Sequence, residues 1–316
     1  MANYQPKLTI IIVNWNTCEL LLNCLDSIDA SSKENLEITY EIIVVDNGSH
    51  DGSAKKIREA YPSIVLIENK ENFGFARANN QAYQRSRSDL ILLLNSDTLV
   101  PAHTVKAMCD FMNKNHKIGA IGVKLLNPDG SFQASYANFP SLWSELVSAT
   151  GLSKIIIGPY APSPRPKRQE KAYPVDWVSG AALLIRREIV NRIGLFDERY
   201  FMYGEETDLR WRIWKSGSSV WYVPDITIIH FGGSSTRLNS IQSYIWLYQS
   251  KVNFFKWNYG QATAKRFCTI LRIIASSKLK VYRILLVLGL KNYKGSKLDQ
   301  RILLEKSLLE TITTEF

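Results

Sequence analysis

The chain has 316 residues, a length that can bury a full hydrophobic core and that suggests one domain with an appendage. Its 46% hydrophobic and 22% charged residues exclude a disordered chain, and four scattered cysteines without a CxxC pair argue against a disulfide framework or a cysteine zinc site. The net charge of +10 comes from residues 256–306, which contain 12 Lys and Arg but only two acids, so that the rest of the chain carries 27 basic and 27 acidic residues.

Apolar, β-rich runs alternate with helical patterns in the first hundred residues. The runs are residues 8–13, 40–45, 64–68 and 90–94, and the helical patterns between them are residues 19–28, 51–61 and 75–85. Such alternation is typical of a parallel sheet with helices on both faces. We therefore predict an α/β fold.

Three of these runs end in polar clusters. The clusters are Asn14-Trp15-Asn16, Asp46-Asn47-Gly48-Ser49 and Asn95-Ser96-Asp97. Because an open α/β sheet binds its ligand beyond the carboxyl ends of its strands, we predict a binding site there. The Asp97 carboxylate is an oxygen ligand of the kind that Mg²⁺ and Mn²⁺ prefer. Two simpler interpretations stay open: a plain turn at residues 46–49 and a helix cap at residues 95–97.

The usual glycine-rich nucleotide motifs are missing. No GxGxxG follows the first strand and no GxxxxGK[ST] occurs anywhere in the chain, which argues against a dinucleotide-binding fold and a P-loop. A bound nucleotide would therefore be held by acidic and amide side chains together with a metal ion.

Two later segments have patterns of their own. Residues 205–208 (EETD) begin a helical pattern, where acids suit the helix dipole and Asp208 can pair with Arg212 one turn on. Residues 154–174 contain five prolines and no periodicity, which predicts a mobile loop, either a lid or an acceptor contact.

Seven segments, in order, resemble the inverting family 2 glycosyltransferases, which have the GT-A fold. The closest likeness is to the rhamnosyltransferase-like branch, whose metal motif reads NxD. The segments are TIIIVNWN, IIVVDNGSHDGS, ENFGFARANN, LILLLNSD, GVKLLNPDGSFQAS, VDWVSGAALLIRRE and GLFDERYFMYGEETDLRWRIWKSG. Together they extend over roughly residues 8–237, and their order makes the resemblance more specific than any single motif.

The resemblance implies a set of donor-binding residues. These are Asn14, Asn16, Asp46, Asn47, Gly74, Arg77, Asn80, Asn95, Ser96 and Asp97. The first four are implied to line the nucleoside pocket, the glycine to let the backbone approach the donor, and the next two to face the diphosphate or the sugar. Asp97 is implied to ligate Mg²⁺ or Mn²⁺. Because Asn95 replaces the Asp of many relatives, we expect weak metal binding.

The resemblance also implies a catalytic base. An inverting transfer needs a carboxylate that accepts the proton of the attacking hydroxyl. The matching position is Glu206, with Glu205 and Asp208 as alternatives. Glu at this position is one methylene longer than the Asp of the family.

Other implied contacts lie further along the chain. His230, in a segment that matches HxxGxS, is implied to close the metal or diphosphate site, although a lone histidine after a strand is often structural. Four residues are assigned to the acceptor side: Trp177, Gly180, Tyr203 and Arg237. Arg237 could instead pair with phosphate.

The last part of the chain is helical, aromatic and basic. We expect a GT-A domain over residues 1–240, with a nucleotide-binding half at 1–100 and an acceptor half at 101–240, followed by a basic amphipathic tail at 241–316. No run has the roughly 18 uncharged residues of a membrane span, and the first residues do not read as a secretion signal. The tail suits the surface of an anionic membrane, although packing against the main domain would also explain its pattern.

The sequence thus predicts a metal-dependent glycosyltransferase in the cytoplasm at the inner membrane face. The donor is expected to be dTDP-L-rhamnose and the acceptor a saccharide, free or linked to a lipid diphosphate, in surface polysaccharide synthesis. A UDP-linked hexose or galactofuranose donor stays open, as does a catalytically silent saccharide- or nucleotide-binding module. A nucleic-acid scaffold is disfavoured because no binding motif is present. The oligomeric state is not predicted.

Overall fold

The structure is a computed structural model that describes residues 6–33, 38–158, 161–164, 171–232, 240–288 and 297–314. The chain divides into two compact units. Unit 1 consists of Met1–Phe139, Ile157–Phe201 and Glu205–Ser235, and unit 2 of Pro140–Ile156, Met202–Gly204 and Thr236–Phe316. Each unit is described by itself, and the functional division at residue 240 stays a prediction.

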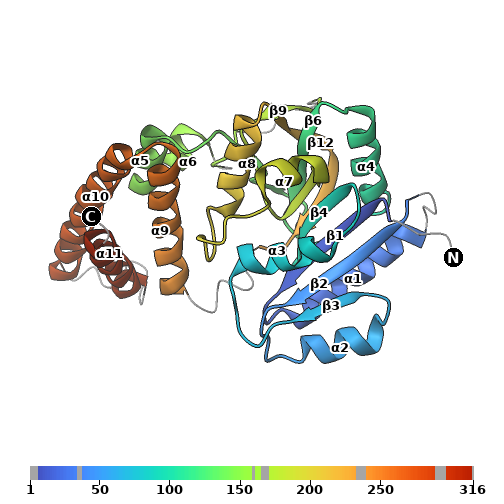
Figure 1. Cartoon of the computed structure of the whole chain (residues 1–316). Helices are drawn as coiled ribbons and strands as arrows, with labels where there is room; N and C mark the ends of the chain where they lie inside the picture. Colours follow the sequence, from blue (N-terminus) through green and yellow to red (C-terminus); the bar gives the residue numbers. More distant parts are fainter. Residues whose placement is uncertain are drawn as a thin grey trace. The chain divides into compact units, whose positions relative to one another are not determined.

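The first half of unit 1 has the alternating pattern that the sequence predicts. Strands β1 (Leu8–Asn14), β2 (Tyr40–Asp46), β3 (Val65–Glu68) and β4 (Leu90–Asn95) pair in parallel in the order β3-β2-β1-β4. Helices α1 (Cys18–Lys33), α2 (Ser53–Ala60) and α3 (Phe75–Arg85) connect them (Figure 1). The predicted strands and helices of this half are confirmed, with small differences at their ends.

The second half of unit 1 turns the parallel sheet into a mixed one. Strand β11 (Ala182–Arg186) lies antiparallel between β4 and β6 (Ile118–Leu126), and β12 (Ser219–His230) runs parallel to β6. Three short strands complete the sheet: β5 (Thr98–Leu99), β7 (Phe132–Gln133) and β9 (Tyr173–Val175). The helices of this half are α4 (Thr104–Lys114), α7 (Arg187–Ile193) and α8 (Glu205–Lys215). The α/β class is thereby confirmed.

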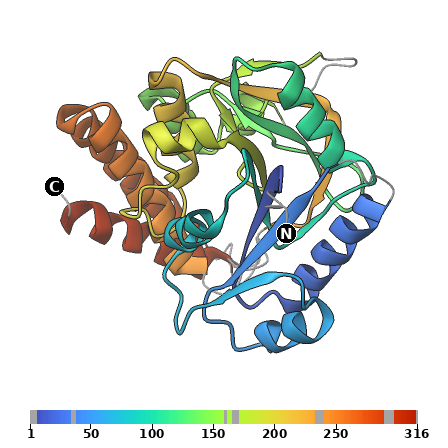
Figure 2. The ribbon, with the colours of Figure 1, turned by 45° about the vertical axis from the view of Figure 1, so that its right-hand side comes forward.

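Alternate residues of the central strands build two cores. Ile10 and Ile12 of β1 belong to the cluster formed with α1, α2 and α4, whereas Ile11 belongs to the cluster formed with α3, α7 and α8. A strand buried on both faces must be apolar at every position, which is why LTIIIV and LILLL show no alternation. Figures 1 and 2 show the helices around the sheet of unit 1.

The helix-cap interpretation of residues 95–97 is wrong. Asn95-Ser96-Asp97 does not cap a helix, because β5 follows directly and α4 begins only at Thr104. The loop predicted at residues 154–174 begins within α6 (Ser153–Ile156) and ends within β9, and residues 159–160 and 165–170 of it lie outside the described residues. The Ser163 hydroxyl is fully buried, accepts hydrogen bonds from the Ser135 and Tyr136 amides, and anchors residues 161–164 beside β8 (Tyr136–Ala137).

Unit 2 is helical and has its own core. Helices α5 (Leu142–Thr150), α9 (Ser240–Asn258), α10 (Gln261–Val287) and α11 (Lys297–Thr314) bury apolar residues against one another. Ion pairs join Lys251 to Glu145 at 2.7 Å and Lys278 to Glu305 at 2.7 Å, with both carboxylates largely buried.

Candidate active site

The ends of β1 and β2 are joined by a network of polar side chains. The two strands are in register at Asn14 and Asp46, and the Asn14 amide donates to the Asp46 carboxylate at 2.9 Å and to the Ser49 hydroxyl at 3.2 Å. The Ser49 backbone N–H donates to the Asp46 carboxylate at 3.1 Å, and the Ser49 hydroxyl accepts the Asn16 N–H at 3.0 Å. Because β4 also pairs in parallel with β1, with Asn95 opposite Val13, the three polar strand ends lie at one edge of the sheet, as predicted.

Asn47 shapes the turn that leads to α3. Its amide nitrogen donates to Asn72 Oδ1 at 2.8 Å and to the Gly74 carbonyl at 3.2 Å. Its amide oxygen accepts from Asn69 Nδ2 at 2.9 Å and from the Phe73 N–H at 3.2 Å. An amide side chain has two donors and two acceptor sites, and the protein fills all four. Asn47 therefore positions the turn, and the predicted nucleoside contact would require one of these bonds to be exchanged.

Gly74 brings the start of α3 against the segment before α8. Its φ of 86° lies in the left-handed region, and a Cβ atom there would collide with the Phe201 carbonyl. That carbonyl accepts the Phe75 N–H at 2.9 Å. The close backbone approach at Gly74 is therefore to Phe201, and the predicted approach to the donor stays a prediction.

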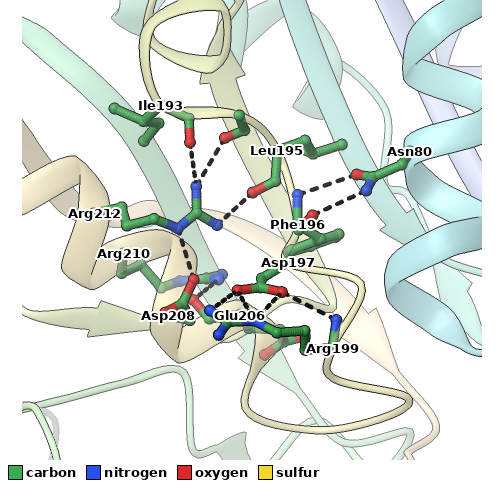
Figure 3. A network of polar contacts seen from close by, with 11 residues as sticks. Asn80, Ile193, Leu195, Phe196, Asp197, Arg199, Glu206, Asp208, Arg210 and Arg212 are labelled. Atoms are coloured by element: carbon green, nitrogen blue, oxygen red, sulfur yellow. Dashed lines mark hydrogen bonds and ion pairs between the residues drawn. The ribbon is translucent and has the colours of Figure 1, made fainter. Parts of the chain in front are cut away.

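Arg77 and Asn80 follow on α3. Arg77 is exposed, with its guanidinium 4.4 Å from the centre of the Phe73 ring. Asn80 donates to the Phe196 carbonyl at 2.9 Å and accepts the Phe196 N–H at 3.1 Å (Figure 3). Its amide also donates to Glu198 at 3.0 Å. Asn80 thus fixes the segment between α7 and α8, and a donor contact for either residue stays a prediction.

The end of β4 forms the second polar group of the site. His230, at the end of β12, has its Nε2 atom 3.1 Å from Asp97 Oδ1 and 3.3 Å from Asn95 Nδ2. The Ser96 hydroxyl lies 2.9 Å from that of Thr17, which donates to Asn14 at 2.7 Å. The predicted metal residues and the predicted nucleoside residues are therefore linked.

Gln133 determines the tautomer of His230. Its amide nitrogen donates to Asn127 Oδ1 at 3.0 Å and to the His230 carbonyl at 3.1 Å, so its oxygen faces His230 Nδ1 at 2.7 Å. Nδ1 must therefore carry a hydrogen, and when the ring is neutral Nε2 presents a lone pair. Orientation of a metal-binding histidine through its second nitrogen is common in proteins.

The facing atoms of Asp97 and His230 fit a divalent cation. Asp97 Oδ1 and His230 Nε2 are 3.1 Å apart, and a carboxylate oxygen and the lone pair of a neutral imidazole are both ligands for such an ion. Two ligands at right angles around an ion at about 2.1 Å are about 3 Å apart, as in octahedral Mg²⁺ coordination. Within the described ranges no group of three or more His, Cys, Asp or Glu forms a metal cluster. Two protein ligands suit an ion that also binds substrate phosphates and water.

Glu206 lies in the first turn of α8 and contacts Gly180. The Gly180 N–H donates to Glu206 Oε2 at 3.2 Å, and any Cβ atom at position 180 would overlap the carboxylate. The next carbonyl, that of Ala181, accepts the Asn95 N–H at 3.0 Å. The backbone from the Gly180 N–H to the Ala181 carbonyl therefore connects the Glu206 carboxylate to the end of β4.

Glu205 is in a different environment from Glu206. It is 3% exposed, and its Oε2 atom has no hydrogen-bond partner within the described part of the chain. Burial, and next the nearby charge of Glu206, raise the pKa of Glu205 to about 8. Glu205 is therefore mostly neutral at pH 7. A carboxyl group that already holds its proton cannot accept another, so Glu205 is a weaker candidate for the general base than Glu206.

Arg210 is the buried cation of α8. Its side chain is 0% exposed, and Nη1 donates to the Glu206 carbonyl at 2.7 Å. Among the residues that the structure describes, its Nε and Nη2 atoms have no hydrogen-bond partner. Burial lowers the pKa of Arg210, and the charges of Glu206 and Glu205 oppose that shift. No sequence pattern pointed to Arg210, because an arginine in an amphipathic helix is usually solvated.

The Asp208 carboxylate is held in an ion pair with Arg212. The carboxylate accepts from Arg212 Nε at 2.6 Å, as expected for a pair one helical turn apart. Arg212 also donates to the carbonyls of Ile193, Gly194 and Leu195 at 2.6 to 3.0 Å (Figure 3). This clamp fixes the end of α7 to α8, so Asp208 is a weaker candidate for the base than Glu206.

The acceptor-side residues are only partly brought together. Gly180 contacts Glu206, and Trp177 begins the short strand β10 (Trp177–Val178), which pairs with β8. Tyr203, with a φ of 65°, belongs to unit 2. Arg237 lies outside the described residues. The sequence missed Gln133, whose only signal was its place in the GVKLLNPDGSFQAS segment.

Comparison with known proteins identifies related sequences. Residues 9–194 match the family model described as "Glycosyl transferase family 2". The N-acetylglucosaminyl-diphospho-decaprenol L-rhamnosyltransferase of Mycobacterium tuberculosis is 34% identical over 155 residues, which are 47% of this chain and 48% of that protein. Rhamnosyltransferase WbbL of Escherichia coli K12 is 26% identical over 179 residues, or 55% of this chain and 64% of that protein. The chain thus spans about half the length of the mycobacterial relative.

Solved structures share the fold at low sequence identity. The mannosyltransferase PcManGT from Pyrobaculum calidifontis, in complex with GDP-Man and Mn²⁺, has a TM-score of 0.56 at 18% identity, covering 99% of this chain and 87% of that one. GalNAc-T7 with UDP, GalNAc and Mn²⁺ has a TM-score of 0.53 at 17% identity, covering 72% and 44%. The GT-A architecture expected from the sequence is confirmed by this likeness.

Proposed function

Because the chain belongs to glycosyl transferase family 2, we propose that it is a metal-dependent inverting glycosyltransferase that moves a sugar from a nucleoside diphosphate to a saccharide acceptor. The proposed donor is dTDP-L-rhamnose, and the acceptor a saccharide, free or lipid-linked, in cell-surface polysaccharide synthesis, since two relatives are rhamnosyltransferases. The observation that carries the proposal is the Gly180–Ala181 backbone, which connects the Glu206 carboxylate to Asn95 beside Asp97 and His230.

The proposed reaction uses Glu206 as general base. The acceptor hydroxyl gives its proton to the Glu206 carboxylate as its oxygen bonds to the anomeric carbon, and the bond from that carbon to the diphosphate oxygen breaks with inversion. The Gly180 N–H holds the carboxylate while leaving its other oxygen for the hydroxyl. The buried Arg210 guanidinium donates to the backbone carbonyl of Glu206, and the preceding residue, Glu205, is mostly neutral at pH 7.

The departing diphosphate needs positive charge, which a divalent cation supplies when bound. Asp97 and His230 would hold the ion, with Asn95 beside them. Gln133 keeps the His230 lone pair directed toward Asp97. Of Asp97, His230 and Asn95, only Asp97 has an anionic side chain. The ion should therefore bind more tightly when the diphosphate oxygens also ligate it.

Nucleotide binding tests this proposal directly. We expect dTDP with Mn²⁺ to raise the melting temperature, because a ligand that binds the folded state stabilises it by RT ln(1 + [L]/Kd), or about 2.7 kcal/mol at a hundredfold excess over Kd. The measurement is thermal unfolding with dTDP, UDP, GDP and CDP, each with and without Mn²⁺. A rise in melting temperature with UDP alone would indicate a UDP-sugar as the donor in place of dTDP-L-rhamnose. The absence of any metal-dependent shift would contradict the proposal.

We further propose that unit 2 contacts the cytoplasmic face of an anionic membrane. None of the described helices is long and apolar enough to cross a bilayer. One face of α10 exposes apolar side chains at helical spacing, and exposed basic residues lie on it and beside it. The apolar residues are Ile273, Val281, Ile284 and Val287, and the basic ones are Lys280 and Arg283. Such a face buries aliphatic groups among lipid headgroups while its cations bind anionic lipid.

Vesicle binding tests this contact. We expect the protein to sediment with vesicles that contain phosphatidylglycerol but not with pure phosphatidylcholine. Ile284→Asp should weaken binding about tenfold or more, because a charge replaces an aliphatic group worth about 1.5–3 kcal/mol when buried. Leu303→Asp is the matched control, since Leu303 is also an exposed aliphatic residue of unit 2, on α11. Equal binding by both variants and the unmodified protein would contradict the contact.

A further inference from the structure

Three aromatic side chains form a cluster on unit 1 that the proposed reaction does not use. The ring centres of Phe139 and Trp211 are 5.0 Å apart, those of Trp211 and Trp214 are 5.1 Å apart, and those of Phe139 and Trp214 are 6.3 Å apart. Trp211 is 8% exposed, whereas Trp214 is 57% exposed. The cluster is therefore a fixed support with one large indole in contact with solvent.

Helix α8 connects this cluster to the proposed base. Glu206 is in its first turn and Trp214 in its last, and eight residues of α-helix extend about 12 Å. Thr207, Trp211 and Trp214 follow one another at spacings of four and three, which places them in one row on the helix surface.

A second segment, residues 176–180, also connects the aromatic cluster to Glu206. The Phe139 N–H donates to the Asp176 carboxylate at 3.0 Å, and four residues further on the Gly180 N–H donates to Glu206. Of these residues Trp177 and Val178 form strand β10, and four residues of chain reach at most about 13 Å, close to the length along α8. Two independent elements therefore join the exposed indole to the base, with the Asp176 carboxylate beside the cluster.

The chemistry of the cluster suits a sugar ring. A pyranose has a face of C–H groups that packs on an indole while its hydroxyls stay hydrated. Trp presents a large rigid surface for little loss of side-chain entropy, and here neighbouring rings already hold it. Lys215, whose ammonium lies 5.4 Å from the Trp211 ring centre, and Asp176 provide polar groups at the edge of the cluster.

We propose that Trp214 is a saccharide subsite, on which a sugar ring of the acceptor chain stacks while the reacting hydroxyl of the same chain lies at Glu206. This inference rests on the proposed transferase function and specifies its acceptor. The separation exceeds one pyranose ring, so the acceptor class is an oligosaccharide of at least two residues.

Binding to defined glycans tests the subsite. The probe is an array of immobilised saccharides of one to five residues, built from rhamnose, galactose, glucose and N-acetylglucosamine. We expect the unmodified protein to bind members longer than one residue, and Trp214→Ala to bind the same members about tenfold more weakly, the scale of an aromatic stacking contact. Trp214→Phe should retain most of the binding. Trp143→Ala is the matched control, because Trp143 is 67% exposed and lies in unit 2.

The outcomes separate the subsite from the transferase function. Equal glycan binding by Trp214→Ala and the unmodified protein, or no binding by either, would overturn the subsite. If the metal-dependent nucleotide shift persists in that case, the transferase proposal stands alone. If the unmodified protein shows no metal-dependent nucleotide shift, both the transferase proposal and the subsite are wrong. If Trp214→Ala loses binding to phosphatidylglycerol vesicles and keeps glycan binding, the indole contacts lipid and the subsite is wrong.

Discussion

Glu206→Gln is expected to lower the rate of sugar transfer by about 10²- to 10⁴-fold, the usual contribution of a positioned general base. Glutamine keeps the length of the side chain and an oxygen that can accept the Gly180 N–H, so the local structure should persist. It cannot take the acceptor proton at neutral pH. The measurement is release of free nucleotide from dTDP-L-rhamnose with and without a saccharide acceptor.

Glu205→Gln is the matched control, one residue away. We expect transfer within a fewfold of the unmodified protein, since Glu205 is buried and mostly neutral at pH 7. If this variant loses transfer and Glu206→Gln keeps it, the roles of the two residues are exchanged. The nucleotide-dependent thermal shift should persist in both variants, which separates loss of the base from loss of donor binding.

Glu205→Gln should also change how the stability of the protein depends on pH. The pKa of Glu205 is raised from 4.5 to about 8, so between these values the folded chain holds a proton that the unfolded chain has released. The free energy of unfolding therefore falls as pH rises through this window, by up to about 1.4 kcal/mol per pH unit from this group. Glu205→Gln has no such proton, so denaturant unfolding at pH 5.5 and 8 should show a smaller decrease for the variant.

Asp97→Asn is expected to abolish the metal-dependent thermal shift with dTDP and to lower transfer by about a hundredfold or more. The substitution preserves the shape of the side chain and removes the carboxylate charge that faces His230 Nε2. A metal that stabilises the charge of a leaving group contributes several kcal/mol, and each 1.36 kcal/mol is tenfold in rate.

Asp89→Asn is the control for this substitution. Asp89 is exposed just before β4, whereas Asp97 lies just beyond the other end of the same strand. We expect it to leave both the nucleotide shift and the transfer rate unchanged. A folded Asp97→Asn protein that keeps its Mn²⁺-dependent shift would show that the cation is bound elsewhere or is not required.

The sequence predicted the donor half of the fold well because its signals are local. Strands β1, β2 and β4 are buried on both faces, so each is a continuous apolar run, and its polar end marks the edge of the sheet. That Asn14, Asp46 and Asn95 meet follows from parallel pairing alone. The metal and base assignments came from a family resemblance and stay predictions.

Contacts between distant segments were not predictable in this way. His230 meets Gln133 across 97 residues, and Glu206 meets Gly180 across 26, and no periodicity encodes either contact. Arg210 reads as a surface residue of an amphipathic helix, but it is fully buried beneath the first turn of α8. Such sites depend on how the second half of the chain packs, which composition and spacing do not determine.

The hydrogen bonds of Asn80 and Phe75 have a mechanical consequence. Asn80 holds Phe196, and the Phe75 N–H holds Phe201, so α3 is fastened twice to the stretch that leads into α8. A displacement of the donor turn is therefore transmitted to the helix that carries Glu206. These bonds hold the start of α3 at a fixed spacing from the stretch before α8, so the proposed donor site and the proposed base keep their separation when no substrate is bound.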